Sequence, residues 1–191
     1  VISLADSPRR ATIRRAVGRH GVDFDFEDAF DARALDADAC SAMTDTVRVI
    51  ARYGRLLSRG EVGCFMSHVR VWEKIVRSGR AAIVPEDDAM LDDALFERFL
   101  STPGELLSDH ADFVLLGRSK LSRDRAAQAY LYEPLKRARR IGGLQIGVPF
   151  KQWTSGAVGY WISVHGARKA LEHARGPVGA GSLPLEAAMA C

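Results

Sequence analysis

Three consecutive carboxylates, Glu86-Asp87-Asp88, follow an apolar run formed by residues 81–84 and Pro85. Acids clustered at the end of a buried strand repel one another, and both burial and like charge favour their protonated forms. A divalent cation or a basic partner would offset that repulsion. Because a site made only of oxygen ligands suits Mg²⁺ or Mn²⁺ better than Zn²⁺, the triplet is a candidate metal site.

Two arginines stand early in the chain, where the sequence predicts the start of a helix. Arg9 and Arg10 follow Ser7-Pro8, which reads as an N-cap and a first-turn proline. The first turn of a helix favours phosphate through its unpaired N–H groups and the helix dipole, and a guanidinium adds a bidentate anion grip. The alternative is a solvent-facing basic helix that continues to Arg14 and Arg15.

His68 lies four residues after Cys64 on another predicted helix, a spacing that places both side chains on one face and fits a zinc pair. Two further ligands are not at hand, so a packed or hydrogen-bonding histidine is the favoured interpretation, and Ser67 shares it. The chain has 3 cysteines and no C-x-x-C pair, so we expect free thiols in a reducing compartment.

The segments that must position these residues alternate between strands and helices. We expect strands at residues 1–4, 22–26, 81–84, 112–116 and 157–164, and helices at residues 7–20, 64–78, 91–100 and 166–175. Residues 31–60 are polar with weak helical pieces, and residues 118–150 predict a long loop or insertion. The alternation favours a single α/β domain over residues 1–191, with a Rossmann-type, mostly parallel sheet flanked by helices. Ligands bind at the carboxyl ends of such strands, so residues 7–10 and 86–88 are expected to face one crevice.

Composition limits the class of protein. The chain has 191 residues, of which 47% are hydrophobic and 27% charged, as in an ordinary globular domain. It contains no apolar run of about 20 residues and no basic segment typical of a secretory signal, so we expect a cytoplasmic protein. Basic residues gather at 9–15 and 118–140, which predicts an anionic partner such as a diphosphate, a glycolipid or a membrane surface. Nucleic acid is not expected, since no nucleic-acid-binding module is present.

Several segments, in order, resemble glycosyltransferase family 25, which includes lipopolysaccharide, lipooligosaccharide and collagen galactosyltransferases. The resemblance is carried by Val1-Ile2-Ser3-Leu4 with Arg9-Arg10, Leu57-Ser58-Arg59-Gly60-Glu61-Val62-Gly63-Cys64-Phe65-Met66-Ser67-His68, Trp72, residues 83–88, and Ser155-Gly156-Ala157-Val158-Gly159-Tyr160. The G-E-x-G-C-x-x-S-H block, followed about twenty residues later by E-D-D, is the most specific part.

This resemblance implies a GT-A type nucleotide-binding sheet, a UDP-sugar donor, usually UDP-galactose, and inverting transfer to a saccharide or hydroxylysine hydroxyl. The acidic motif would grip Mn²⁺ and the donor diphosphate, with Glu86 and Asp88 nearest the metal and Asp87 a ligand or ribose contact. Glu61 would belong to the donor pocket, unless it is a surface acid before the helix. His68 and Ser67 would contact the nucleotide or the diphosphate.

Further expectations concern the second half of the chain. Ser155-Gly156 opens the last expected strand, where small residues let the backbone approach a ligand, although a glycine there also suits a bulge. Inverting transfer needs a carboxylate that accepts the acceptor's proton. Glu186 is the first choice, because Pro184-Leu185-Glu186 matches a family P-[IV]-D element with Glu for Asp, and Asp112 is the second.

The chain also departs from the family pattern. Ser3 stands where Asn is usual and Pro85 where an aliphatic residue is usual. Pro177-Val178-Gly179 is an alternative match to the P-[IV]-D element, and it would leave the acid absent. The chain ends short of the usual C-terminal segment, so part of the acceptor site is expected to be missing.

The sequence therefore predicts a metal-assisted glycosyltransferase that moves a hexose from a UDP-sugar to a saccharide acceptor such as a lipopolysaccharide core. The basic residues 118–140 would recruit an anionic lipid-linked acceptor at the cytoplasmic face of the inner membrane. One alternative is a non-catalytic relative that binds a nucleotide sugar or polysaccharide. A second is a sugar-phosphate nucleotidyltransferase, although residues 5–8 lack the Gly-rich loop of that class.

Overall fold

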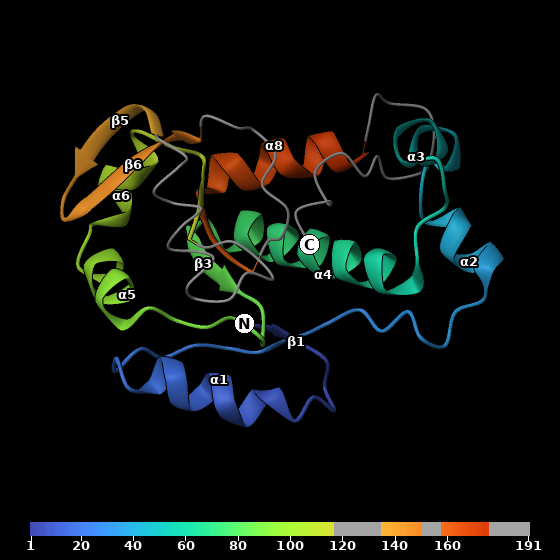
Figure 1. The fold of residues 1–191 in the computed structure, drawn as a ribbon, viewed down its shortest axis with the longest axis horizontal. Coiled ribbons are helices and arrows are strands. Elements are labelled where there is room, and N and C mark those ends of the chain that lie inside the picture. Colours follow the sequence, from blue (N-terminus) through green and yellow to red (C-terminus); the bar gives the residue numbers. More distant parts are fainter. Residues whose placement is uncertain (117–134, 150–157, 176–191) are drawn as a thin grey trace.

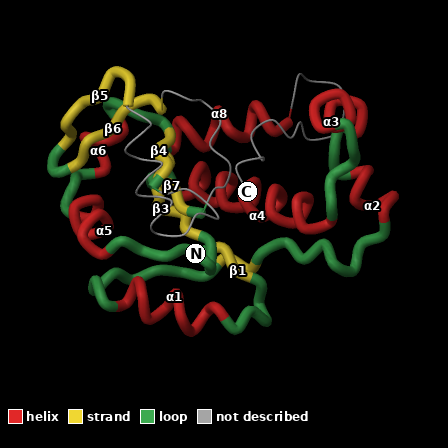
Figure 2. Tube along the Cα trace, in the orientation of Figure 1, coloured by secondary structure: helices red, strands yellow, loops and turns green. Residues whose placement is uncertain are grey.

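Two small sheets meet edge to edge at the centre of the protein in the computed structural model, which describes residues 1–116, 135–149 and 158–175 (Figures 1 and 2). In one sheet, β1 (Ile2–Ser3) pairs in parallel with β2 (Glu27–Asp28). In the other, β7 (Gly159–Ile162) lies between β3 (Ala82–Pro85) and β4 (Phe113–Leu115) and is antiparallel to both. A parallel bridge between Ile2 and Glu86 joins β1 to the end of β3.

The predicted mixture of strands and helices in one domain is confirmed, but the mostly parallel sheet is not. The described strand pairings are mostly antiparallel, because β7 crosses between β3 and β4 in the opposite direction. Periodicity in the sequence shows where a strand forms, but it carries no information about which strand becomes its neighbour.

Pro85 ends β3 without disturbing the pairing to β7. The Glu86 N–H donates to Val158 O at 2.9 Å, so residue 86 directs its backbone N–H towards β7. The backbone N–H groups of successive strand residues point towards opposite neighbouring strands. The position where Pro85 lacks an N–H therefore faces away from β7.

The helices cover the sheets on both sides. They are α1 (Arg9–Gly18), α2 (Ala37–Ala42), α3 (Thr46–Tyr53), α4 (Arg59–Ser78), α5 (Asp93–Leu100), α6 (Gly104–Ser108) and α8 (Val164–Arg175). Figure 1 shows α4 and α8 side by side, with α1 across β1 from α4. No helix in the described ranges is long and apolar enough to cross a membrane.

The α4 helix begins earlier than predicted because Ser58 and Glu61 form a capping box. The Ser58 side chain accepts from the Glu61 N–H, and the Glu61 carboxylate accepts from the Ser58 N–H at 2.7 Å. This arrangement satisfies two N–H groups that a helix start otherwise leaves unpaired. Gly79 ends the helix with φ +65°, a conformation that glycine adopts without strain.

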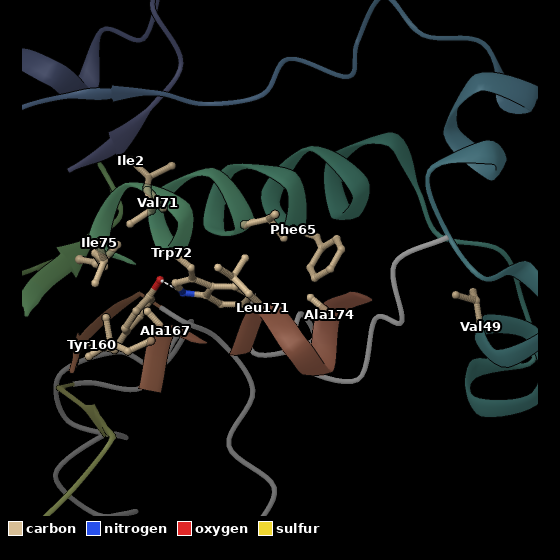
Figure 3. Packing of buried hydrophobic residues seen from close by; sticks show 13 residues of the cluster. Ile2, Val49, Phe65, Val71, Trp72, Ile75, Tyr160, Ala167, Leu171 and Ala174 are labelled. Carbon is tan, nitrogen blue, oxygen red and sulfur yellow. Dashed lines mark hydrogen bonds between the residues drawn. The ribbon is translucent and has the colours of Figure 1, made fainter. Parts of the chain in front are cut away.

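One face of α4 forms the centre of the hydrophobic core (Figure 3). Phe65, Val69, Trp72 and Ile75 recur at helical spacing and are buried. They pack with residues of α8 and β7, namely Ala167, Leu171, Ala174, Tyr160 and Ile162. The small side chains of the buried Ala167 and Ala174 let α8 lie close to α4.

Part of the segment expected to be a long loop is a β-hairpin. Strands β5 (Leu135–Ile141) and β6 (Leu144–Pro149) pair antiparallel and are joined at Gly142-Gly143, where Gly142 has φ +58°. A two-glycine turn between strands is a strong hairpin signal, so the sequence did contain the cue. Ile141 and Leu144 are buried in a second cluster with Phe99, Leu107 and Trp161. Residues 118–134 and 150 lie outside the described ranges.

The backbone after β2 lies directly on α4, at two small residues of the helix. A Cβ atom added to Gly63 would lie 2.8 Å from Phe30 O. One turn later, Ser67 Oγ accepts from the Phe30 N–H at 2.8 Å and donates to Gly63 O at 2.6 Å. Gly63 and Ser67 together fix residues 29–32 against the start of α4.

Gly63→Ala tests this close approach. We expect a loss of about 1–3 kcal/mol in the free energy of unfolding, measured with urea, because the new methyl group must displace the Phe30 carbonyl. Gly60→Ala is the matched control on the same helix. Its Cβ would meet nothing nearer than Ser58 Oγ at 4.0 Å, so stability should be unchanged or rise by up to about 1 kcal/mol. Equal stabilities of the two variants would contradict the close packing at Gly63.

Candidate functional site

A cavity of about 270 Å³ lies where β1, β2 and β3 end. Its lining comes from β1 itself with Leu4 and Arg9 after it, residues 29–33 after β2, residues 86–88 after β3, and the first turns of α4. Among the residues predicted for the site, it contains Arg9, Ser67, Glu86, Asp87 and Asp88. The arginine motif and the acidic motif therefore share one cavity at the carboxyl ends of three strands, as the sequence predicted.

A larger depression of about 650 Å³ lies on the outer face of α4. It is lined by charged side chains such as Arg70, Lys74 and Glu73, and the Lys74 ammonium pairs with Glu27 at 3.4 Å. It is broad and open, and it contains none of the predicted site residues. The smaller cavity is therefore the candidate site.

Asp87 is the most constrained residue of the acidic triplet. Its carboxylate accepts from Ser3 Oγ at 2.7 Å and from Ser7 Oγ at 2.6 Å, and it pairs with Arg9 Nε at 3.0 Å. The side chain is only 7% exposed. Because both carboxylate oxygens are already bonded, Asp87 connects β3 to the β1–α1 segment instead of offering ligand atoms. Ser7 uses its hydroxyl for Asp87, and Pro8 takes the N-cap position of α1.

Arg9 and Asp88 face the solvent beside this cluster. The Asp88 side chain is 53% exposed, and its carboxylate lies 3.8 Å from the Arg9 guanidinium. No other ion pair or hydrogen bond involves Asp88 within the described part of the chain. Asp88 is thus the acid of the triplet that is most available to a ligand.

The Arg10 side chain holds neighbouring elements together and does not line the cavity. Its guanidinium donates to Ser3 O at 2.9 Å, pairs with Asp28 and lies 4.7 Å from the Phe26 ring centroid. These contacts connect α1 to β1 and to β2. Of the two arginines predicted to hold an anion, only Arg9 lines the cavity.

Glu86 turns towards the core. Its Oε1 atom lies 3.3 Å from His68 Nε2, and His68 Nδ1 lies 2.8 Å from the Tyr160 hydroxyl. The interpretation of His68 as a buried, hydrogen-bonding residue therefore fits the structure. Glu86 Oε2 has no hydrogen-bond partner among the described residues.

Cys64, His68 and Glu86 place one potential ligand atom each within 4.8 Å of one another. However, Cys64 is disulfide-bonded, so its sulfur is not a thiolate and the expectation of free thiols is wrong at this position. Cys40 is free and buried. The two remaining donors, one imidazole and one carboxylate, fall short of the four ligands of a structural zinc site.

The acidic triplet does not form a cage of three carboxylates around one point. Cys64, His68 and Glu86 are the only group of at least three possible ligands within the part of the chain that the structure describes. Mg²⁺ and similar ions are commonly held by one or two carboxylates together with substrate phosphates. Glu86 through Oε2 and Asp88 fit that donor set, whereas Asp87 does not.

Glu61 lies outside the cavity lining. Its carboxylate caps α4 and pairs with Arg55 at 2.6 Å. Hydrogen bonds from Arg55 and then Ser58 lower the pKa of Glu61 to about 2. The structure thus favours the interpretation of Glu61 as a residue of the helix start over a place in the donor pocket.

Asp112 lies at the other end of the three-stranded sheet. It precedes Phe113, which pairs with Ile162, whereas Glu86 follows Pro85 at the opposite end of β7. The Asp112 carboxylate binds Lys169 Nζ at 2.8 Å and His165 Nδ1 at 2.8 Å, which lowers its pKa to about 2. The structure does not bring Asp112 to the cavity, so we do not retain it as the base. Glu186, Ser155 and Gly156 lie outside the described residues.

The sequence analysis missed one side of the cavity, formed by Phe30, Asp31, Arg33 and Arg59. Arg33 pairs with Asp31 at 2.7 Å and with Asp6 at 3.1 Å, and its hydrogen bonds lower the pKa of Asp31 to about 2. Phe30, Asp31 and Arg33 follow a strand, as Arg9 and the acidic triplet do. They were missed because the strand was expected at residues 22–26, whereas β2 is Glu27–Asp28. Arg59 is the first residue of α4, which was expected to begin at residue 64.

Comparison with known families agrees with the motif pattern. The chain matches the family described as "Glycosyltransferase family 25 (LPS biosynthesis protein)" over residues 1–180. The chain belongs to glycosyltransferase family 25. The resemblance drawn from the sequence motifs is confirmed.

Individual relatives in this family carry different descriptions. "Procollagen galactosyltransferase 1" of Danio rerio is 30% identical over 176 residues, or 88% of this chain and 27% of that protein. "Probable inactive glycosyltransferase 25 family member 3" of Rattus norvegicus is 30% identical over 180 residues, or 90% of this chain and 29% of that protein. "Glycosyltransferase 25 family member" of Aedes aegypti is 28% identical over 162 residues, or 80% of this chain and 24% of that protein. The chain thus corresponds to less than a third of each of these glycosyltransferase family 25 proteins.

Asp87→Asn tests the structural role of Asp87. We expect a loss of about 2 kcal/mol in the free energy of unfolding, because an amide cannot accept from Arg9 and two hydroxyls as a carboxylate does. Asp88→Asn is the matched control, with an expected change within about 0.5 kcal/mol, because Asp88 is exposed and weakly paired. The reverse order in urea unfolding would show that Asp87 is not the structural acid.

Asp112 should contribute to acid sensitivity. Its folded pKa of about 2 lies below the unfolded value, so its stabilisation is present above about pH 4 and is lost as the pH falls towards 2. Asp112→Asn should lose about 1 kcal/mol in the free energy of unfolding at pH 6, a small loss because the ion pair is partly exposed. The difference from wild type should disappear near pH 2.

The exposed Asp109 supplies the control for this pH series. Asp109→Asn should follow the wild-type urea midpoint at every pH. A constant gap between Asp112→Asn and wild type from pH 6 to pH 2 would contradict the assignment.

Proposed function

We propose that this chain binds the diphosphate and nucleoside of a UDP-sugar in the cavity at the ends of β1, β2 and β3. It transfers the hexose, galactose in the first instance, to a hydroxyl of a saccharide acceptor. The observation that carries the proposal is the convergence of Arg9, Glu86 and Asp88 on one cavity within the region that matches glycosyltransferase family 25. We further propose that the mixed strand arrangement is the core of a GT-A type sheet.

Each part of the cavity has a separate task in this proposal. The departing UDP gains negative charge as the glycosidic bond breaks, and Arg9 at the start of α1 lies where a cation and helix N–H groups stabilise that charge. A bound Mn²⁺ or Mg²⁺ ion would supply further positive charge at the diphosphate. Asp88 and Glu86 Oε2 would hold that ion.

The proton of the acceptor hydroxyl must move to a carboxylate during inverting transfer. Asp112 lies at the opposite end of the three-stranded sheet from Glu86, so we propose Glu186 as the base.

The acceptor proposal draws on the hairpin of β5 and β6. Residues 135–140 are exposed and include Lys136, Arg137, Arg139 and Arg140, and no acid occurs in residues 135–149. A surface of this charge suits an anionic glycolipid acceptor, such as a lipopolysaccharide core, at the cytoplasmic face of a membrane. The family description, which includes lipopolysaccharide biosynthesis, supports the same choice.

A non-catalytic relative that binds the donor without turnover is the second candidate. The motivation is that relatives named as inactive match this chain at 30% and 29% identity over 90% of its length. The nucleotidyltransferase alternative is not retained, because the chain belongs to another family.

Calorimetric titration with UDP and with UDP-galactose, each with and without Mn²⁺, tests the donor site. We expect binding that requires Mn²⁺ and that Asp88→Asn weakens at least about tenfold, as loss of a metal contact does. Asp38→Asn, an exposed acid in the first turn of α2, is the control and should bind as wild type does. Absence of Mn²⁺-dependent UDP binding to the wild-type chain would overturn the proposal. If the wild-type chain does bind UDP-galactose, release of UDP when saccharide acceptors are added would support the enzyme. Binding without release of UDP would support the non-catalytic relative.

A further inference from the structure

Four polar side chains form a continuous hydrogen-bonded line from the core to the cavity. Trp72 Nε1 donates to the Tyr160 hydroxyl at 3.0 Å, and that hydroxyl lies 2.8 Å from His68 Nδ1. His68 Nε2 lies 3.3 Å from Glu86 Oε1. Figure 3 shows the Tyr160 hydroxyl meeting the Trp72 indole between α4 and β7. The line thus connects a helix, a strand and the acidic motif.

The chemistry of the two ends fixes the direction of every hydrogen bond. An indole N–H only donates, and an ionised carboxylate only accepts. His68 therefore carries its proton on Nε2, facing Glu86. The single proton of the Tyr160 hydroxyl then points to the lone pair of His68 Nδ1, since the Tyr160 oxygen accepts from Trp72. Each donor in the line has one acceptor.

The other proton arrangements leave a buried group unpaired. With a proton on Nδ1, both His68 and Trp72 would donate to the Tyr160 oxygen, and the Tyr160 proton would have no acceptor among the described residues. Tyr160 is only 1% exposed, so water cannot replace that acceptor easily. Burial also raises the pKa of Tyr160 above its usual range, so the hydroxyl keeps the proton that it donates.

The line ends on Glu86, an acid that contacts a buried histidine and also lines the cavity. His68 is 2% exposed and belongs to α4, which is fixed in the core by Phe65, Trp72 and Ile75. Its imidazole therefore has little freedom to move, and it holds Glu86 Oε1. Glu86 also lines the cavity, and its second oxygen has no partner within the described ranges.

We propose that His68, as the neutral Nε2–H tautomer, is a positioning residue that holds one oxygen of Glu86 so that the other serves the ligand. Tyr160 and Trp72 fix the tautomer from behind. His68 therefore acts through Glu86 and does not contact the nucleotide. The role at the ligand rests on the proposed function, whereas the tautomer rests on the geometry alone.

Long-range ¹H–¹⁵N NMR spectra of the imidazole nitrogens test the tautomer in the ligand-free chain. The spectra should show that His68 is protonated on Nε2 and unprotonated on Nδ1. His68→Gln identifies its signals among the 5 histidines. A proton on Nδ1, in either the other tautomer or an imidazolium, would overturn the proposal.

Binding of UDP with Mn²⁺ tests the positioning role. His68→Ala and Tyr160→Phe should weaken binding by about 10- to 100-fold, as loss of an outer-shell partner of a metal ligand does. His68→Gln should retain most of the affinity, because its amide N–H can still donate to Glu86. Val69→Ala, the next residue on α4 and 5% exposed, is the control. It should lower the melting temperature without changing the dissociation constant.

The outcomes separate this inference from the proposed function. If the wild-type chain binds UDP with Mn²⁺ and His68→Ala binds equally well, the positioning role is wrong and the donor site stands. If His68→Ala weakens binding only as far as Val69→Ala does, the effect is general destabilisation and the role is again wrong. If the wild-type chain does not bind UDP with Mn²⁺, the proposed function fails and the positioning role fails with it.

Discussion

The cavity depends on one nearly buried negative charge, the carboxylate of Asp87. Removing a carboxylate from water is strongly unfavourable unless charged or hydrogen-bonding partners replace the water. Here the partners are Ser3 at the end of β1, Ser7 in the following turn and Arg9 at the start of α1. The chain cannot bury Asp87 without also bringing these segments to the end of β3. The same interactions shape one wall of the cavity.

The acidic triplet resolves its mutual repulsion by separation. Glu86 points to His68 in the core, Asp87 to two hydroxyls and an arginine, and Asp88 to solvent near Arg9. Glu86 directly follows β3, whereas Asp87 and Asp88 lie in the turn that the Ala89 N–H closes on Glu86 O at 3.2 Å, so three adjacent acids need not share one point. The sequence argument that the cluster requires a cation therefore overstated the need. A metal at this site would depend on the phosphates of a ligand as much as on the protein.

Local features were predictable, and relations between distant segments were not. Apolar spacing located α4, α5 and α8 within a few residues, and Ser58-x-x-Glu61 contained the cap that would have placed the start of α4. Spacing could not show that β7 lies between β3 and β4, and so it could not show that Asp112 is at the far end from Glu86. It also could not separate Arg9 from Arg10, because their difference depends on Asp28 and Asp87, which lie far away in sequence.

The block that identified the family is composed of residues with structural tasks in this chain. Glu61 caps α4, Gly63 admits the Phe30 backbone, Ser67 binds that backbone, and His68 holds Glu86. A match to this block therefore indicates that the residues which build the walls of the cavity are present. It does not by itself separate a catalyst from a protein that only binds a donor. That distinction must depend on groups with little structural work, which among the described residues of the acidic triplet are Asp88 and the second oxygen of Glu86. Relatives named as galactosyltransferases and relatives named as inactive both match this chain over most of its length.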